Sequence, residues 1–217
     1  MVGTRFRVIY VTSSAFKAEE NAIYHSIGKL PDGTSVKDVC EFEIRPVPIK
    51  EVLEVELEAM VLAEVTKAYS EIKVPCIVEH AGLIFDGHAS YPGGLTKPMW
   101  NALGEAFVRE TNSANRRATA KAVIAYCDGL EVHTFSGETT GVIAPEPRGQ
   151  REFYWDTVFI PDGPDNPDAL TYAELVQRSD VGLEGKVVRF SQSAKAMTKF
   201  LEYRRQAGAP DLWARYR

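Results

Sequence analysis

Strand-like apolar runs alternate with longer helical segments along this 217-residue chain. Residues 6–11 form an apolar run typical of a buried strand, and residues 17–30 follow with helical periodicity. The clearest helix is predicted over residues 51–70, where apolar side chains recur every three or four positions. That apolar face comprises Val52, Val55, Ala59, Leu62, Val65 and Tyr69. The alternation favours an α/β fold with a mixed, twisted central sheet flanked by helices.

Shorter segments complete the predicted fold. Further strands are expected over residues 41–47, 74–78 and 121–126. Asp128-Gly129 predicts a two-residue hairpin turn into a strand that runs through Phe135. One face of a middle helix is marked by Trp100, Leu103 and Phe107, and a final helix is predicted over residues 193–205.

Charge and cysteine usage limit the class of protein. A net charge of −5 argues against a nucleic-acid polymer as partner, because such interfaces are usually basic. Cys40, Cys76 and Cys127 lie in apolar contexts without metal-ligand or disulfide spacing, which indicates reduced, buried thiols of a cytoplasmic protein. The N-terminus has no signal-peptide core, and no apolar run approaches the ~20 residues that a membrane span needs. We expect one domain over residues 1–217 and no membrane partner.

Residues 148–163 combine a basic loop, an aromatic triplet and one acid in front of an apolar run. The rings of Phe153, Tyr154 and Trp155 can stack on a base, and the carboxylate of Asp156 can accept hydrogen bonds from base N–H groups. Arginine in the loop suits phosphate. A core strand with a charged lead-in is the alternative explanation for the same residues.

Five motifs follow one another in the second half of the chain. They are the strand from Phe135 to Ile143, Pro147-Arg148-Gly149, Phe153-Tyr154-Trp155-Asp156-Thr157-Val158-Phe159, Pro161-Asp162-Gly163 and Thr171-Tyr172-Ala173-Glu174-Leu175. In this order they resemble the inosine triphosphate pyrophosphatase family, and the resemblance extends from Val8 to about Tyr203. Members hydrolyse non-canonical purine nucleoside triphosphates to monophosphate and pyrophosphate. The resemblance implies two lobes with a substrate cleft between them, a homodimer, and a role in cleansing the nucleotide pool.

The predicted strand-to-helix turn at residues 12–20 carries hydroxyls and a lysine. Free N–H groups at a helix N-terminus suit a triphosphate, although a simple Ser or Thr N-cap explains the same residues. The family has Thr-Gly-Asn-x-x-Lys here. Thr12 and Lys17 match, whereas Ser13 and Ser14 replace Gly and Asn. The resemblance implies substrate contacts by Thr12, Ser14 and Lys17, with Lys17 also taking part in catalysis.

Glu51, Glu54 and Glu58 are expected on one face of the long helix. Mg²⁺ on a triphosphate is typically held by one or two carboxylates plus phosphate oxygens and water. A solvated acidic face is the commoner meaning of such a run. The resemblance places a metal-binding Glu at about Glu51. Glu64 falls where most members have a lysine that contacts phosphate, a contact that a carboxylate cannot make.

Glu79-His80-Ala81 replaces the Glu-Asp-Ser/Thr of the family, whose Asp is the presumed metal ligand and base. Imidazole can act as a base near neutral pH, but it is a poor ligand for Mg²⁺. Glu79 or Glu51 is then the expected ligand of Mg²⁺ or Mn²⁺, and His80 the catalytic base, with Ala81 beside the substrate. A histidine without chemistry is the alternative. Lys97 matches the lysine of the family's phosphate loop.

Residues 186–195 correspond to the family's Lys-Asn-x-Ile/Val-Ser-His-Arg, whose His-Arg pair grips the 6-keto edge of the purine. Lys186 and Ser191 match if one residue is inserted, and the pair then falls on Gln192 and Ser193. Glutamine both donates and accepts hydrogen bonds, whereas protonated His and Arg only donate, so base preference is expected to differ. Arg189 is the other candidate to reach the base.

These motifs together imply Mg²⁺-dependent hydrolysis of a nucleoside triphosphate between the α- and β-phosphates, by a water activated by His80 or a nearby carboxylate. Phe153 and Trp155 are expected at the base and Asp156 at its edge. Phosphate contacts are expected from Lys17, Lys97 and Lys186. Two alternatives stay open: a relative with a shifted nucleotide substrate in a specialised pathway, and a nucleotide-binding protein that has lost catalysis.

Overall fold

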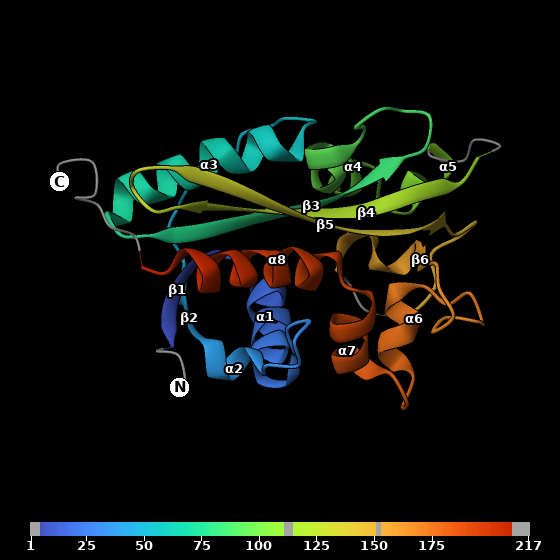
Figure 1. Cartoon of the computed structure of the whole chain (residues 1–217). Coiled ribbons are helices and arrows are strands. Elements are labelled where there is room, and N and C mark those ends of the chain that lie inside the picture. The colour runs from blue at the N-terminus through green and yellow to red at the C-terminus, as the bar shows by residue number, and fades with distance from the viewer. Residues whose placement is uncertain (1–4, 111–114, 151–152, 210–217) are drawn as a thin grey trace.

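The computed structural model describes residues 5–110, 115–150 and 153–209. Within them, six strands form one sheet in the order β2-β1-β3-β4-β5-β6 (Figure 1). The strands are β1 Phe6–Val11, β2 Cys40–Arg45, β3 Cys76–Phe85, β4 Arg117–Cys127, β5 Val132–Ile143 and β6 Phe159–Pro161. β1 runs parallel to β2 and β3, and the remaining neighbours are antiparallel. The predicted mixed α/β sheet is confirmed.

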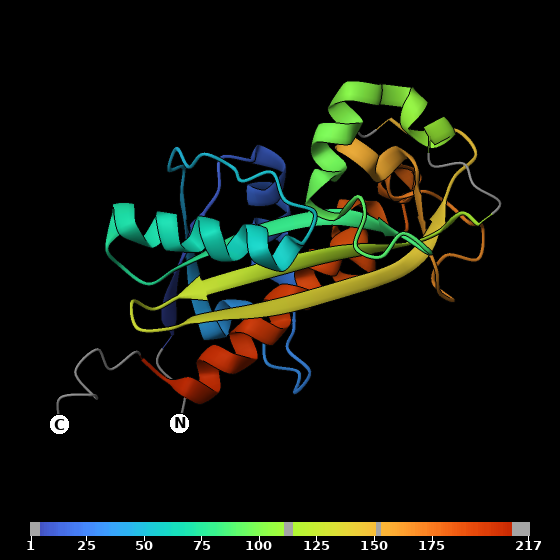
Figure 2. The same ribbon diagram turned by 90° about the horizontal axis from the view of Figure 1, so that it is seen from above.

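Helices cover both faces of this sheet. The α-helices are α1 Ala15–Ile27, α2 Val36–Val39, α3 Leu57–Ile72, α4 Thr96–Leu103, α5 Phe107–Glu110, α6 Tyr172–Gln177, α7 Gly182–Gly185 and α8 Gln192–Ala207. Short 3₁₀ helices are η1 Gly93–Leu95, η2 Gly104–Ala106 and η3 Tyr154–Thr157, and η4 Lys186–Phe190 is a π-helix. α3 and α4 lie on one face, and α1, α2 and α8 lie on the other (Figure 1). Figure 2 shows α3 and α4 over opposite ends of the long strands β3, β4 and β5.

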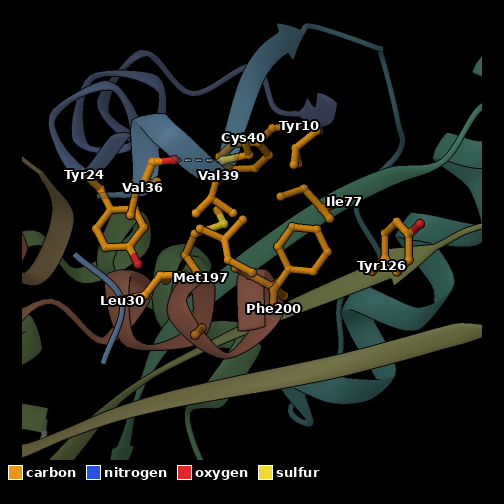
Figure 3. Packing of buried hydrophobic residues seen from close by; sticks show 14 of the residues in the cluster. Tyr10, Tyr24, Leu30, Val36, Val39, Cys40, Ile77, Tyr126, Met197 and Phe200 are labelled. Carbon is orange, nitrogen blue, oxygen red and sulfur yellow. Dashed lines mark hydrogen bonds between the residues drawn. The ribbon is translucent and has the colours of Figure 1, made fainter. Parts of the chain in front are cut away.

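The pleat of β3 divides its side chains between two cores. Ile77 packs with Tyr10, Met197 and Phe200 on the α1 and α8 side (Figure 3). Cys76 and Val78, one position before and after Ile77, pack in the core beneath α3. Successive side chains of a strand point to opposite faces. The next residues along β3, Glu79 and His80, therefore also diverge.

The C-terminal end of β3 belongs to a third core. Leu83 and Phe85 pack there with Phe107 of α5, Phe159 of β6 and Tyr172 of α6. The sheet therefore carries one set of cores at its β1 end and another at its β6 end. Residues 79–81 of β3 lie between these two sets of cores.

The long helix differs from the prediction. α3 begins at Leu57, and residues 51–56 are not helical, so Glu51 and Glu54 do not share a helix face with Glu58. A tertiary contact explains this: Gly94 N donates to the Val55 carbonyl at 2.9 Å, which holds the segment against η1. The inward face is also shifted from the predicted one, since Leu62 is 40% exposed. The buried side chains are Leu57, Met60, Val61, Glu64, Val65 and Ala68.

Several smaller expectations need correction. α1 begins at residue 15 and ends at 27, because Ser14 caps its start and Gly28 its end. The hairpin after β4 has a four-residue loop rather than two, since Cys127 pairs with Val132. The middle helix breaks at Gly104, whose φ of 53° no continuing helix can have. The strands at 76–85, 117–127 and 132–143 are longer than predicted.

The prediction of buried thiols is confirmed. Cys40, Cys76 and Cys127 are free and buried. Burial raises the pKa of the Cys40 and Cys76 thiols to about 12, so both stay protonated at neutral pH. No helix among residues 5–110, 115–150 and 153–209 is long and apolar enough to cross a bilayer.

Gly137 on β5 sets how closely α8 approaches the sheet. A Cβ at this position would fall inside van der Waals distance of the Gln192 carbonyl and the Ala196 amide. Gly137→Ala should therefore lower the free energy of unfolding by about 1–3 kcal/mol through overpacking. Thr134→Ala, an exposed change on the same strand, is the matched control and should cost less than about 1 kcal/mol. Urea midpoints that do not separate the two variants would contradict this packing.

Candidate active site

A cleft of about 380 Å³ opens where the two sets of cores meet. Its wall combines residues 11–17 of the β1–α1 turn, residues 47–51, residues 78–81 of β3, and parts of α3 and α4. β2 and β3 both follow β1 in the chain, and in the sheet they lie on opposite sides of it. Open α/β sheets bind ligands at the carboxyl end of such a strand. The fold thus supplies a ligand cleft beside the turn at residues 12–17.

A second, smaller chamber of about 30 Å³ adjoins the cleft. The two share four lining residues: Lys17, Glu79, Ala81 and Phe153. The smaller chamber is enclosed by α1, the π-helix and the start of α8, including Gln192 and Ser193. The site is therefore divided in two, with Lys17 and Glu79 at the boundary.

The turn at residues 12–17 presents a helix N-terminus to the cleft. Ser14 is the N-cap of α1, and its hydroxyl accepts from Lys17 N at 3.4 Å. The amide of Ser14 donates to the Thr12 hydroxyl at 3.2 Å. The Lys17 ammonium donates to the Glu79 carbonyl at 2.5 Å, which ties α1 to β3. Hydroxyls, a lysine and the N-terminus of a helix thus gather in one place, an arrangement that suits an anion.

Both carboxylate oxygens of Glu79 are engaged on the α1 and α8 side. Tyr10 donates to Oε2 at 2.7 Å, and Ser193 donates to Oε1 at 2.8 Å. Burial raises the pKa of Tyr10 well above its usual value, and the negative charge of Glu79 raises it further. Tyr10 therefore stays a hydrogen-bond donor across the physiological range, and Glu79 is a fixed acceptor in the chamber wall.

Lys186 is a buried cation beneath the smaller chamber, only 2% exposed. Its ammonium donates to Glu20 Oε1 at 2.7 Å and to Asp156 Oδ2 at 3.1 Å. Burial by itself would lower the pKa of Lys186, but the charges of Asp156 and Glu20 outweigh it and the pKa is raised. Lys186 is therefore charged. Asp156 lies behind it, in neither cavity wall, rather than at an open base edge.

Both expected metal ligands, Glu51 and Glu79, line the large cleft. Glu51 lines the cleft, where its Oε1 accepts from the Lys97 ammonium at 3.2 Å. The carboxylate of Glu79 is held by Tyr10 and Ser193. Within the described part of the chain, no three His, Cys, Asp or Glu side chains are grouped so that they could hold a metal ion. The described residues thus form no protein-only metal centre.

His80 and Glu64, two departures from the family pattern, are in direct contact. His80 Nε2 lies 2.5 Å from Glu64 Oε2, and both residues line the large cleft. The side chain of Glu64 is 6% exposed and that of His80 is 17% exposed. The second oxygen of Glu64, Oε1, is buried without a hydrogen-bond partner. A buried carboxylate and an imidazole therefore face one another at the cleft wall.

The structure gathers most of the predicted site residues. The large cleft is lined by Thr12, Ser14, Lys17, Glu51, Glu79, His80, Ala81, Lys97, Phe153, Tyr154 and Trp155. The small chamber adds Lys186, Ser191, Gln192 and Ser193. Arg189 is exposed and lines neither, because the π-helix turns its side chain outward. Arg151 and Glu152 of the basic loop lie outside the described residues.

The sequence analysis missed Tyr10, Glu20 and Asn21. Glu20 follows Lys17 by three positions and so shares its helix face, which is the one available indication. Tyr10 and Asn21 carry no sequence signature of their contacts. Asn21 lines the small chamber, and its Oδ1 is buried without a hydrogen-bond partner.

Fold and site together define an α/β protein with a divided cleft suited to a phosphorylated ligand. Residues 8–203 match the model of the Ham1 family, and the chain belongs to that family. It is 31% identical over 187 residues to the dITP/XTP pyrophosphatase of Hyperthermus butylicus, covering 84% of this chain and 92% of that protein. It is 29% identical over 201 residues to the inosine triphosphate pyrophosphatase of Kluyveromyces lactis, covering 90% and 94%. The family expected from the motifs is confirmed.

Solved structures agree with this fold. The Staphylococcus aureus Ham1 protein superposes with a TM-score of 0.62 at 17% identity, covering 93% of this chain and 100% of that chain. A HAM1 protein from Coxiella burnetii superposes with a TM-score of 0.64 at 18% identity, covering 91% and 99%. At these identities the likeness shows the fold alone.

The buried cluster around Lys186 yields a stability prediction. Lys186→Met should lower the free energy of unfolding by about 3–5 kcal/mol, because Asp156 and Glu20 lose a buried cationic partner. Lys199→Met, an exposed lysine on α8, is the matched control and should change it by less than about 1 kcal/mol. Urea unfolding followed by circular dichroism measures both, and similar midpoints would show that the cluster contributes little.

Proposed function

We propose that the protein hydrolyses non-canonical purine nucleoside triphosphates to nucleoside monophosphate and pyrophosphate and so cleanses the nucleotide pool. The observation that carries this proposal is the divided site, in which a large cleft with two lysines in its wall and a small chamber meet at Lys17 and Glu79. The names of relatives that match most of the chain, dITP/XTP pyrophosphatase and inosine triphosphate pyrophosphatase, support it.

The large cleft receives the triphosphate. Lys17, Lys97 and the helix N-terminus at Ser14 supply positive charge and N–H donors along its wall. Glu51 is the cleft carboxylate with an exposed side chain, 46% exposed, and would hold a divalent cation that arrives on the triphosphate. Mg²⁺ or Mn²⁺ at that place would neutralise phosphate charge. His80 faces the same cleft and serves as the base for the attacking water.

The small chamber receives the base. Its volume of about 30 Å³ has room for only one or two water molecules, so a purine must widen it. Phe153 lines both cavities and packs against Phe16, with ring centroids 4.9 Å apart. We expect these rings to separate and Phe153 to stack on the base. Trp155 packs against Phe159 at 5.8 Å and lines only the large cleft.

We further propose a cytoplasmic homodimer with one domain in each chain, as the family resemblance implies. Apolar side chains that a second chain could cover are exposed before and on α3: Val52, Leu53 and Leu62. An elution volume of a monomer in light-scattering chromatography at micromolar concentration would contradict the dimer.

The first activity prediction concerns the product. Inosine triphosphate with Mg²⁺ should yield pyrophosphate, because the cleavage lies between the α- and β-phosphates. Phosphorus NMR distinguishes pyrophosphate from orthophosphate directly, without a coupling enzyme. Orthophosphate formed without added pyrophosphatase would contradict the proposal.

Two lysine variants, one in the site and one outside it, show whether the activity in this assay belongs to the protein or to a contaminant. Lys17→Ala removes a cation at the junction of cleft and chamber and should reduce kcat/KM at least tenfold, about 1.4 kcal/mol of transition-state stabilisation. Lys37→Ala changes an exposed lysine on α2 and should leave the rate unchanged. Equal rates for both variants would place the activity elsewhere.

The second activity prediction concerns which base the protein prefers. It tests the alternative that the protein acts on a different nucleotide from the rest of its family. Gln192 and Ser193 stand where the family has a donor pair, and an unmet polar group in a buried pocket costs ~1–3 kcal/mol. Discrimination for inosine and xanthosine over adenosine triphosphate should therefore be below a hundredfold. Steady-state kcat/KM for inosine, xanthosine, guanosine, adenosine and pyrimidine triphosphates measures it. A larger preference, above about 2.7 kcal/mol, would mean that other residues rebuild keto recognition.

A further inference from the structure

We propose that Glu64 is a positioning residue for His80, and that the two act as a carboxylate–imidazole pair which activates the attacking water. The proposal rests on the proposed function and deepens it, since it assigns a role to a glutamate at a position where most members of the family have a lysine. It starts from the 2.5 Å contact between Glu64 Oε2 and His80 Nε2 at the wall of the large cleft.

The contact follows from where the two side chains are anchored. His80 shares its strand face with Cys76 and Val78, which pack beneath α3. Glu64 lies on the buried side of α3, with Val61 and Val65 of the same core as neighbours on the helix. Both backbones are thus fixed by apolar packing. A side chain fixed in this way can hold an imidazole in one orientation.

The carboxylate also decides which nitrogen of His80 carries the proton. A carboxylate only accepts, so Nε2 must be the N–H group. In the neutral ring, Nδ1 is then the acceptor, and no described residue hydrogen-bonds to it. An imidazole with one nitrogen bound to a carboxylate and the other unbonded can take a proton at that second nitrogen. This is the arrangement of a general base and its orienting acid.

A purely structural role for the Glu64–His80 pair does not explain why the Glu64 carboxylate is buried. Glu64 is 5% exposed, and its Oε1 has no hydrogen-bond partner. Burying a carboxylate is unfavourable unless its oxygens are satisfied, and an apolar side chain at this place in α3 would avoid that cost. A half-satisfied acid in contact with a histidine at a cleft wall is therefore better explained by the chemistry of the cleft.

In the proposed step, water attacks a phosphorus of the α–β anhydride and His80 takes its proton. The water oxygen bonds to a phosphorus of the α–β anhydride, and the bond from that phosphorus to the bridging oxygen breaks. The bridging oxygen leaves with the other fragment and takes the electron pair. The water proton passes to Nδ1 of His80, and the imidazolium so formed is stabilised through its Nε2–H bond to Glu64.

The test is a double-mutant cycle with inosine triphosphate and Mg²⁺. Glu64→Gln keeps the size of the side chain but removes its charge, and should lower kcat at least tenfold with KM changed less than threefold. His80→Gln should lower kcat about a hundredfold or more, as the loss of a general base does. The double variant should be no slower than His80→Gln alone, because residues that act as a unit are not additive. Glu71→Gln, an exposed acid on the same helix, should keep the kcat of the unaltered protein.

A spectroscopic readout separates positioning from stability. In ¹⁵N-histidine-labelled protein, the nitrogen shifts of His80 should report the Nε2–H tautomer, and Glu64→Gln should weaken that preference. A Glu64→Gln protein with unchanged kcat and tautomer, but a lower melting temperature, would overturn the proposal. So would additive losses of kcat in the double variant. If the unaltered protein releases pyrophosphate, either result contradicts only the proposed Glu64–His80 pair and leaves the proposed function standing. If it hydrolyses no nucleoside triphosphate, the proposed function falls and the pair with it.

Discussion

The pleat of β3 is the constraint on which both parts of the site depend. β3 is paired on both sides, with β1 in parallel and with β4 in antiparallel register, so each of its side chains has a fixed direction. Glu79 is directed to α1 and α8, and His80 to α3. A slip of one residue in register would exchange them. The small chamber and the large cleft are therefore formed by neighbouring residues of a single strand.

Buried ionisable groups gather around this strand and depend on distant segments of the chain. Lys186 contacts Glu20 and Asp156, and His80 contacts Glu64. Such groups contribute little net stability compared with apolar side chains of the same size, and breaking one is costly. Their concentration at one cleft is typical of a functional site rather than of a core.

Much of the sheet could be predicted from the sequence, because apolar runs such as residues 6–11 directly report buried strands. Ordered motifs also located most of the cleft wall. The start of α3 could not be predicted, since the Val55 carbonyl is held by Gly94, far along the chain. The Glu64–His80 contact was hidden for a similar reason: the residues lie on different elements, and nothing in their spacing joins them. Both features are set by tertiary contacts, which local sequence patterns do not report.

Both parts of the site carry departures from the motifs of the family. In the large cleft, which we propose receives the phosphates, Thr12, Lys17 and Lys97 match those motifs, whereas Ser14, Glu64 and His80 depart from them. In the small chamber, which we propose receives the base, Gln192 Oε1 accepts from Tyr172 at 3.2 Å, and Glu79 and Asn21 also line the wall. A chamber with both donors and acceptors can satisfy an amino-substituted base edge as well as a keto edge, whereas a His-Arg pair rewards only the keto group. If the small chamber receives the base, as we propose, its wall is where base specificity can change.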